Sequence, residues 1–139
     1  MSNQNEQLTR DLHDSFSNNQ FDKTMELVSD NVHVNAFAFG MSFNSKQGFG
    51  DFMQTFKSAF PDITIKHTNI VSNGNMVAVE FTARGTHNGP LQTPAGAIPP
   101  TGKTVDFNVA EFYIWENGKV VSMNNYQDAG SIMRQIGVM

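Results

Sequence analysis

One carboxylate lies where two patterns of the sequence meet. Asp128 follows a strand-like run over residues 119–127 and precedes a short helical pattern over residues 132–136. An aspartate in this place can cap the helix by accepting from the backbone N–H of Gly130 or Ser131. It can also act as a general base, if apolar side chains at the end of a pocket surround it. One carboxylate can serve in both ways, so we keep both hypotheses for Asp128.

The four histidines lie in different sequence contexts. His87 ends an apolar alternation that begins at Val77, next to a segment rich in proline and glycine. It can orient a substrate oxygen or carry a proton near neutral pH, or it can simply bond a backbone carbonyl. His33 lies in a strand-like run whose two faces are both plausible core. We expect His67 to be structural and His13 to be solvated on the polar side of the first helix.

The last strand-like run also contains two consecutive asparagines, Asn124 and Asn125. Buried amides need hydrogen-bond partners, so the pair predicts a polar patch near the end of that strand. The chain has 12 Phe and 8 Met, which can line a ligand cavity or fill a core. The candidate substrate-binding residues are Asn124, Asn125, His33, Phe37, Phe52, Phe56, Phe81, Trp115 and Met123.

Several classes of function find no support in the sequence. The chain has no cysteine, and no pair of histidines has the spacing of a zinc-binding helix, so we expect no metal site. Its nine Lys and Arg residues are scattered and the net charge is −4, which argues against a nucleic-acid partner. No apolar run reaches the ~18 residues of a membrane span, and the first residues carry no secretory pattern. We therefore expect a cytoplasmic protein without a membrane or nucleic-acid partner.

The periodicities predict the elements that position these residues. Helical stripes cover residues 4–18 and 21–28, and a third helix runs from a Ser45 cap to Pro61. A strand-like run covers residues 29–39. Two hairpins with Asn-Gly turns follow, with strands over residues 62–71 and 76–87, then 104–116 and 119–127. The joining segment 88–102 resembles a lid or binding loop.

This order of elements indicates a single α+β domain over residues 1–139. A curved antiparallel sheet would pack on the N-terminal helices and form a cone with an interior pocket.

Three stretches of the sequence resemble a known family. They are "AFPDITIKHTNIVSNGNMVAVEFTARGTHNGPL", "PPTGKTV" and "FYIWENGKVVSMNNYQDAGSIMRQIG", and they are similar to the SnoaL-like polyketide cyclases, also called ester cyclases. These belong to the nuclear transport factor two-like superfamily. The resemblance implies a cone-shaped α+β barrel, which usually pairs as a homodimer through its sheet.

For the cyclases proper, the resemblance also implies a cofactor-free intramolecular aldol condensation. An aspartate is the general acid/base there, and its motif position matches Asp128. The family's "GTH" motif matches Thr86 and His87. A histidine and a tryptophan that the family often carries fall near Met123 and Asn124, so this chain departs from the pattern.

The leading hypothesis is therefore a small cofactor-independent enzyme of the polyketide-cyclase type. Asp128 would be its general acid/base, and His87 with Asn124 or Asn125 would hold substrate oxygens. The substrate would be a small hydrophobic carbonyl compound. The alternatives are an isomerase or dehydratase on the same fold, a non-catalytic binding protein for small apolar molecules, and an interaction domain with a filled core.

Overall fold

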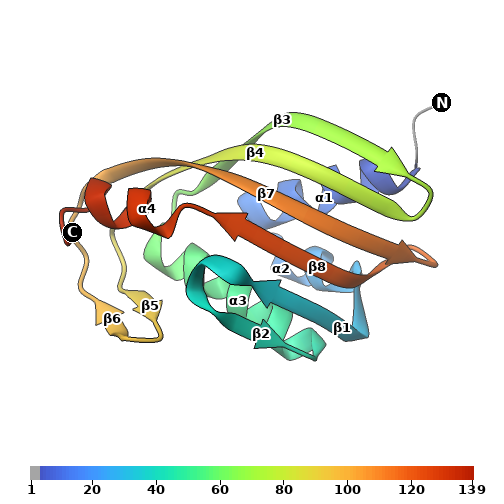
Figure 1. Ribbon diagram of the computed structural model, residues 1–139, viewed down its shortest axis with the longest axis horizontal. Helices are drawn as coiled ribbons and strands as arrows, with labels where there is room; N and C mark the ends of the chain where they lie inside the picture. Colours follow the sequence, from blue (N-terminus) through green and yellow to red (C-terminus); the bar gives the residue numbers. More distant parts are fainter. Residues whose placement is uncertain (1–3) are drawn as a thin grey trace.

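The computed structural model describes residues 4–139; residues 1–3, where the polar N-terminal stretch begins, lie outside the described part. Figure 1 shows the elements in chain order. The helices are α1 (Gln4–Ser17), α2 (Phe21–Glu26), α3 (Lys46–Ala59) and α4 (Ala129–Gln135), with a 3₁₀ turn η1 at Phe37–Phe39. The strands are β1 (Val28–Ala36), β2 (Met41–Phe43), β3 (Thr64–Asn73), β4 (Met76–Thr86), β5 (Leu91–Thr93), β6 (Gly96–Ile98), β7 (Thr104–Glu116) and β8 (Lys119–Gln127).

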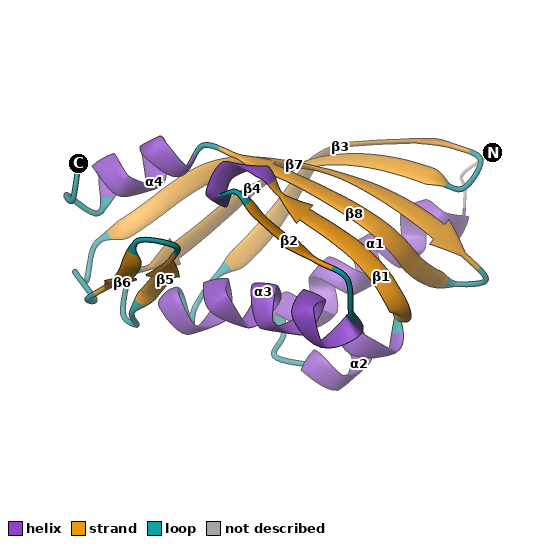
Figure 2. Ribbon diagram, turned by 60° about the horizontal axis from the view of Figure 1, so that its bottom comes forward, coloured by secondary structure: helices purple, strands orange, loops and turns teal. Residues whose placement is uncertain are grey.

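Six strands form one curved sheet in the order β2-β1-β8-β7-β4-β3. Neighbouring strands are antiparallel except β1 and β8, which run parallel. The helices α1, α2 and α3 lie on the concave side of the sheet (Figure 2). The predicted α+β fold with a curved sheet over N-terminal helices is confirmed, although the sheet stays open and one of its strand pairs is parallel.

Side-chain alternation along the strands sets the core. On β4 the residues from Val77 to Gly85 that share its parity are buried, and their neighbours are not, as the sequence predicts. On β1 the buried residues are Val28, Val32, Val34 and Ala36, whereas His33 is exposed. The buried aromatic side chains of α3 fill the space below the sheet, together with Leu12 and Phe16 of α1.

The predicted cap of α3 and the second hairpin turn are present, and the first hairpin turn differs in its residues. The Ser45 side chain accepts from the Gly48 backbone N–H at 3.0 Å and begins α3. Asn117 and Gly118 both have positive φ and connect β7 to β8, as a type I′ hairpin turn requires. In the first hairpin the two turn residues are Gly74 and Asn75, and of these only Gly74 has positive φ.

Two predicted segments differ from the structure. The strand predicted over residues 29–39 ends at Ala36, and after η1 and the left-handed Gly40 the chain reverses into β2. The segment 88–102, predicted as a loop without periodicity, contains the small hairpin β5–β6. No helix within residues 4–139 is long and apolar enough to span a membrane.

Candidate active site

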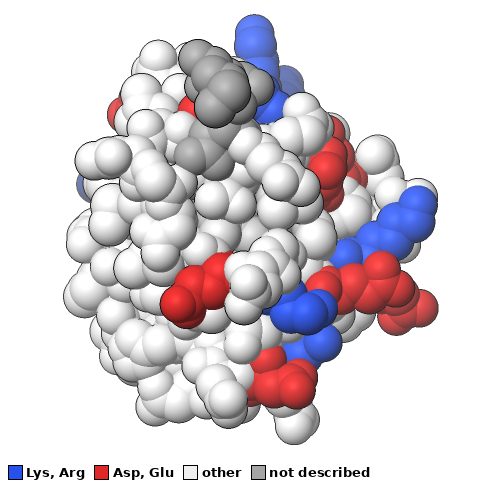
Figure 3. Space-filling view, turned by 90° about the vertical axis from the view of Figure 1, so that its right-hand side faces the viewer, with Lys and Arg blue, Asp and Glu red and all other residues white. Residues whose placement is uncertain are grey.

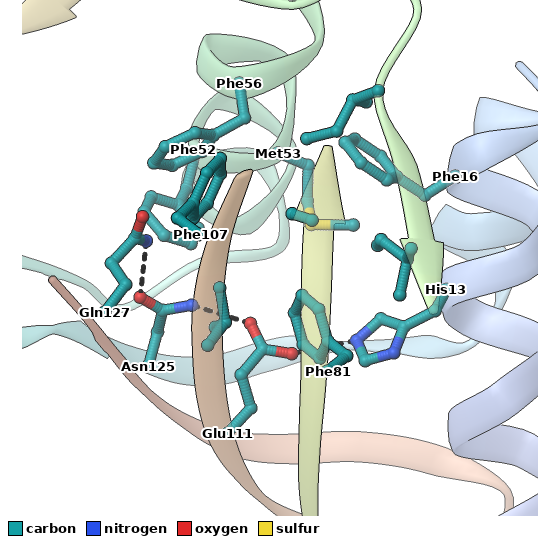
Figure 4. Close-up of a pocket in the computed structure, with 14 residues that line it drawn as sticks. His13, Phe16, Phe52, Met53, Phe56, Phe81, Phe107, Glu111, Asn125 and Gln127 are labelled. Atoms are coloured by element: carbon teal, nitrogen blue, oxygen red, sulfur yellow. Dashed lines mark hydrogen bonds and ion pairs between the residues drawn. The ribbon is translucent and has the colours of Figure 1, made fainter. Parts of the chain in front are cut away.

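An interior cavity lies between the concave face of the sheet and the helices α1 and α3 (Figure 4). Its volume is about 50 Å³, room for a few water molecules or a small chemical group. Most of its lining is apolar, and four polar side chains gather at one end. The lining residues are His13, Phe16, Phe52, Met53, Phe56, Ile63, Ile65, Phe81, Ala83, Phe107, Val109, Glu111, Asn125 and Gln127.

The polar end is built around the carboxylate of Glu111, which is 4% exposed. Its Oε1 accepts from the Tyr113 hydroxyl at 2.6 Å and lies 2.8 Å from Nε2 of His13. Its Oε2 accepts from Nδ2 of Asn125 at 2.7 Å. The carboxylate of this buried glutamate is therefore surrounded by hydrogen-bond donors, as a buried charge requires.

These donors keep Glu111 ionised. Burial on its own raises the pKa of the Glu111 carboxyl. The hydrogen bond and positive charge of His13, together with the hydrogen bonds from Tyr113 and Asn125, outweigh burial and lower that pKa. Burial, with the neighbouring carboxylate, raises the pKa of the Tyr113 phenol well above its usual value. At neutral pH the site therefore contains a carboxylate beside a protonated phenol.

The carboxylate also orients the two amides that follow it in the network. A carboxylate only accepts, so Asn125 turns its Nδ2 toward Glu111, and its Oδ1 accepts from Nε2 of Gln127 at 2.8 Å. This leaves Oε1 of Gln127, which is buried and has no hydrogen-bond partner among the described residues. The dashed lines of Figure 4 follow this chain from His13 to Gln127. The cavity thus offers a free acceptor for a ligand hydroxyl or enol.

His13 connects the carboxylate to a second histidine. Its side chain is buried between Phe81 and Tyr113, and its Nδ1 lies 2.8 Å from Nε2 of His67. The two imidazole rings stack with centroids 5.0 Å apart. Burial, followed by the positive charge of His13 and Arg10, lowers the pKa of His67 to about 4, so His67 is neutral at neutral pH.

The structure places Asp128 outside this cavity. Its Oδ1 accepts from the Ser131 backbone N–H at 2.9 Å, which confirms the predicted cap of α4. The Asp128 side chain is 66% exposed, with Arg134 3.9 Å away. The expectation that this carboxylate faces the interior is corrected, because Gln127 is the last residue whose parity points inward and the chain turns into α4 immediately afterwards.

His87 also lies away from the cavity. It is fully buried beside Phe60 at the base of the segment 88–102. Its Nδ1 accepts from the backbone N–H of Thr101 at 3.2 Å and lies 3.0 Å from the Thr101 hydroxyl. The His87 Nδ1 is therefore bonded to Thr101 and neither faces the cavity nor donates to a backbone carbonyl. Burial lowers the pKa of His87. Thr86, the other residue of the "GTH" match, donates its hydroxyl to Asp62 at 2.8 Å.

The predicted substrate-binding residues divide into two groups. Asn125, Phe52, Phe56 and Phe81 line the cavity. The others do not. His33 bonds Asn44 at the surface, and Phe37 stacks on Tyr126 there. Met123 and Trp115 are fully buried core residues, and Asn124 accepts from Asn35 in the neighbouring strand.

Two central residues of the site were not among the sequence candidates. His13, predicted to be solvated, is 2% exposed, because Thr9, His13 and Phe16 share the face of α1 that packs under the sheet. Glu111 was not singled out. Its signal is its parity, since it is the one charged residue in the inward row of β7.

The comparisons with known proteins agree with this fold. The model of the SnoaL-like polyketide cyclase family matches residues 6–136, so the chain belongs to that family. No curated protein matches the chain.

Solved structures share the fold at low sequence identity. A proposed SnoaL-like polyketide cyclase from Jannaschia sp. CCS1 has a TM-score of 0.86 and 19% identity, with 98% of this chain and 93% of that one covered. IdmH from Streptomyces antibioticus, a proposed polyketide cyclase, has a TM-score of 0.80 and 23% identity over 98% of this chain and 100% of its own. AclR from Streptomyces galilaeus, a proposed hydroxylase, has a TM-score of 0.83 and 18% identity over 98% and 82%. At these identities the likeness concerns the fold.

Proposed function

We propose that the protein is a small cofactor-independent enzyme that performs acid/base chemistry of the intramolecular aldol type on a hydrophobic carbonyl compound. The observation that carries the proposal is an ionised carboxylate, Glu111, at the polar end of an apolar interior cavity. Membership of the polyketide cyclase family favours ring closure as the reaction.

Glu111 is the candidate base because it has an unused acceptor site. Each carboxylate oxygen can accept two hydrogen bonds. Oε1 already accepts hydrogen bonds from His13 and Tyr113, whereas Oε2 accepts one only from Asn125. A substrate C–H next to a carbonyl can therefore approach Oε2 without displacing a partner of the carboxylate.

The proposed reaction is an isomerisation. Glu111 removes the proton from a carbon next to one carbonyl, and the C–H electron pair becomes an enolate. The enolate carbon attacks a second carbonyl of the same molecule and forms the new C–C bond, and the electron pair of that C=O moves onto its oxygen. The resulting alkoxide takes the proton back from Glu111. His13 and Asn125 remain hydrogen-bonded to the carboxylate throughout and keep it oriented.

The cavity also indicates what kind of substrate fits. Ten of the fourteen lining residues are apolar and five of these are phenylalanines, so the group that enters is apolar around the carbonyl. The free Oε1 of Gln127 suits a hydroxyl or an enol on that group. Since the volume is about 50 Å³, only the reactive part of a larger molecule fits without movement of the flexible Met53 and aromatic side chains.

The test is turnover of a panel of hydrophobic 1,5-diketones and hydroxy-diketones, with the cyclic products followed by mass spectrometry and ultraviolet absorbance. Loss of a general base lowers rates by about 10²–10⁴-fold, and we expect Glu111→Gln to do so for any substrate found. The matched control is Glu80→Gln, the same change on an exposed residue of β4, which should leave turnover unchanged.

Two outcomes would contradict the proposal. A folded Glu111→Gln variant with unchanged turnover would remove Glu111 from the chemistry. A protein that binds the diketones in the cavity but leaves them unaltered would instead be a non-catalytic binding protein for small apolar molecules.

A further inference from the structure

The second ring nitrogen of His13, Nδ1, points away from Glu111 and contacts His67, which lies nearer the surface. We propose that His67 is a proton-relay residue through which the buried Glu111–His13 pair exchanges protons with water. This inference rests on the proposed role of Glu111 as a base, and it adds a residue that does not line the cavity.

The geometry forms a continuous hydrogen-bonded chain. His67 Nε2 lies 2.8 Å from His13 Nδ1, and His13 Nε2 lies 2.8 Å from Glu111 Oε1. The chain begins at a half-buried residue of β3, an edge strand of the sheet, and ends at the buried carboxylate that lines the cavity. The His67 side chain is partly exposed, and its Nδ1 has no hydrogen-bond partner among residues 4–139.

His13 is the one partner of Glu111 that suits proton exchange. The Tyr113 phenol keeps its proton because burial and the adjacent carboxylate raise its pKa far above neutral. The Asn125 amide does not ionise in the range of protein function. The remaining approach to Glu111 is the cavity, which is lined mainly by apolar side chains and which a ligand would fill.

The transfer balances as a shift of three protons along the chain when His13 is in its neutral form with its one proton on Nε2. A hydronium ion donates a proton to His67 Nδ1 and becomes water, and the proton on His67 Nε2 moves to His13 Nδ1. The proton on His13 Nε2 then moves to the Glu111 carboxylate. The reverse sequence empties Glu111 and restores both imidazole tautomers, so the relay works in either direction.

The surroundings favour a neutral His67 as the outer member. His13, Arg10 and Asp14 of α1 and Glu111 of β7 are the charged or titratable groups that act on it. Phe81 of β4 packs edge-on against its ring. Because burial together with the positive groups outweighs the two carboxylates, the pKa of His67 is lowered to about 4 and its ring is uncharged at neutral pH. An uncharged imidazole has one nitrogen that can accept a proton and one N–H that can donate it, as a relay requires.

The experiment measures exchange of the His13 ring N–H protons with water, by NMR on the full chain labelled with ¹⁵N-histidine, without any substrate. His67→Gln retains a polar side chain beside His13 but cannot pass a proton through it. We expect exchange at least about tenfold slower in this variant, which corresponds to 1.36 kcal/mol in barrier height. The matched control is His33→Gln, which changes an exposed histidine of β1 and should leave exchange at His13 unaltered.

A second variant keeps the proposal falsifiable if His67→Gln folds poorly. His67→Ala leaves space beside His13, and added imidazole should restore the exchange rate. Unchanged exchange in a folded His67→Gln variant, or no response of His67→Ala to imidazole, would overturn the relay. Because no turnover is measured, these results are independent of whether the proposed reaction takes place.

Discussion

The Glu111 carboxylate keeps its charge in an apolar interior because each of its neighbours donates to it. His13 contributes a hydrogen bond and positive charge, Tyr113 a short hydrogen bond, and Asn125 an amide. Without them, burial would favour the protonated acid, which cannot act as a base. Glu111 is thus the reactive group, and its three hydrogen-bond donors keep it ionised.

Removal of one donor should therefore change the titration of this carboxyl. Tyr113→Phe deletes a hydrogen bond to the charged form, so the pKa of Glu111 should rise. The measurement is the ¹³C chemical shift of the Glu111 carboxyl against pH. For a substrate that is turned over, the acidic side of the rate profile should move to higher pH. A Glu111 titration identical to that of the unaltered protein would show that the phenol does not support the charge.

His67 should make the stability depend on pH in a defined window. Its folded-state pKa is lowered from 6.5 to about 4, so below pH 6.5 the unfolded chain binds a proton that the folded chain does not. Stability should thus fall as the pH drops from 6.5 toward 4. Urea unfolding across this range should show a smaller fall for His67→Gln. Equal pH dependence in both proteins would contradict the lowered pKa, since buried His87 titrates alike in each.

The sequence predicted the helix cap at Asp128 because its signal is local. The Asp128 cap depends on three consecutive positions, and the structure confirms it. The parity of β7 could have identified Glu111, and the period of α1 could have identified His13. The contact between His13 and Glu111 could not be predicted from local patterns, because these residues are 98 positions apart in the sequence and the curvature of the sheet brings them together.

At the scale of elements, α3 and the segment 88–102 hold one end of the molecule together. The Gly89 backbone N–H donates to the Ala59 carbonyl at 3.2 Å, where α3 ends. A Cβ on Gly89 would lie 1.9 Å from the Ser58 carbonyl oxygen. The close approach of two backbones therefore requires glycine at this position.

Gly89→Ala should destabilise the fold by pushing this segment from α3. Overpacking of this kind costs about 1–3 kcal/mol, measurable as a loss in the free energy of unfolding by urea. The control is Gly130→Ala in α4, where the nearest atoms are side-chain atoms, the flexible end of Arg134 at 3.2 Å and the capping Oδ1 of Asp128 at 3.3 Å. That variant should lose less stability, and an equal loss in both would contradict the packing argument.

Long periodic elements were predictable from the sequence, and short ones were not. The stripe of α3 and the alternation of β4 extend over many residues, so their prediction is confirmed. The strands β2, β5 and β6 have three residues each, too few for a periodicity to stand out. Pairing with neighbouring segments, rather than local preference, makes them strands.

At the scale of the whole molecule, the outer face of the sheet carries an exposed aromatic cluster. Phe37, Phe112 and Tyr126 are each more than two-fifths exposed. Their rings contact one another, with centroids 4.9 Å apart for Phe37–Tyr126 and 5.9 Å for Phe112–Tyr126. By contrast, charges of both signs intersperse on the end of the molecule seen in Figure 3.

We propose that this aromatic cluster lies in a homodimer interface, as the family resemblance implies. Light scattering after size-exclusion chromatography should then give twice the chain mass of 15.4 kDa. Phe112→Asp places a charge in the cluster and should return the mass to that of one chain. Gln54→Asp adds the same charge on the exposed side of α3 and should not. A single-chain mass for the unaltered protein would contradict the dimer.

We propose that the interior carboxylate of Glu111, rather than the exposed one of Asp128, removes a proton from carbon. Deuterium incorporation at the carbon next to the carbonyl of a hydrophobic aryl ketone tests it directly, because this measurement needs no ring closure. In heavy water the unaltered protein and Asp128→Asn should both accelerate the exchange, and Glu111→Gln should not. Exchange that persists in Glu111→Gln and disappears in Asp128→Asn would contradict the account.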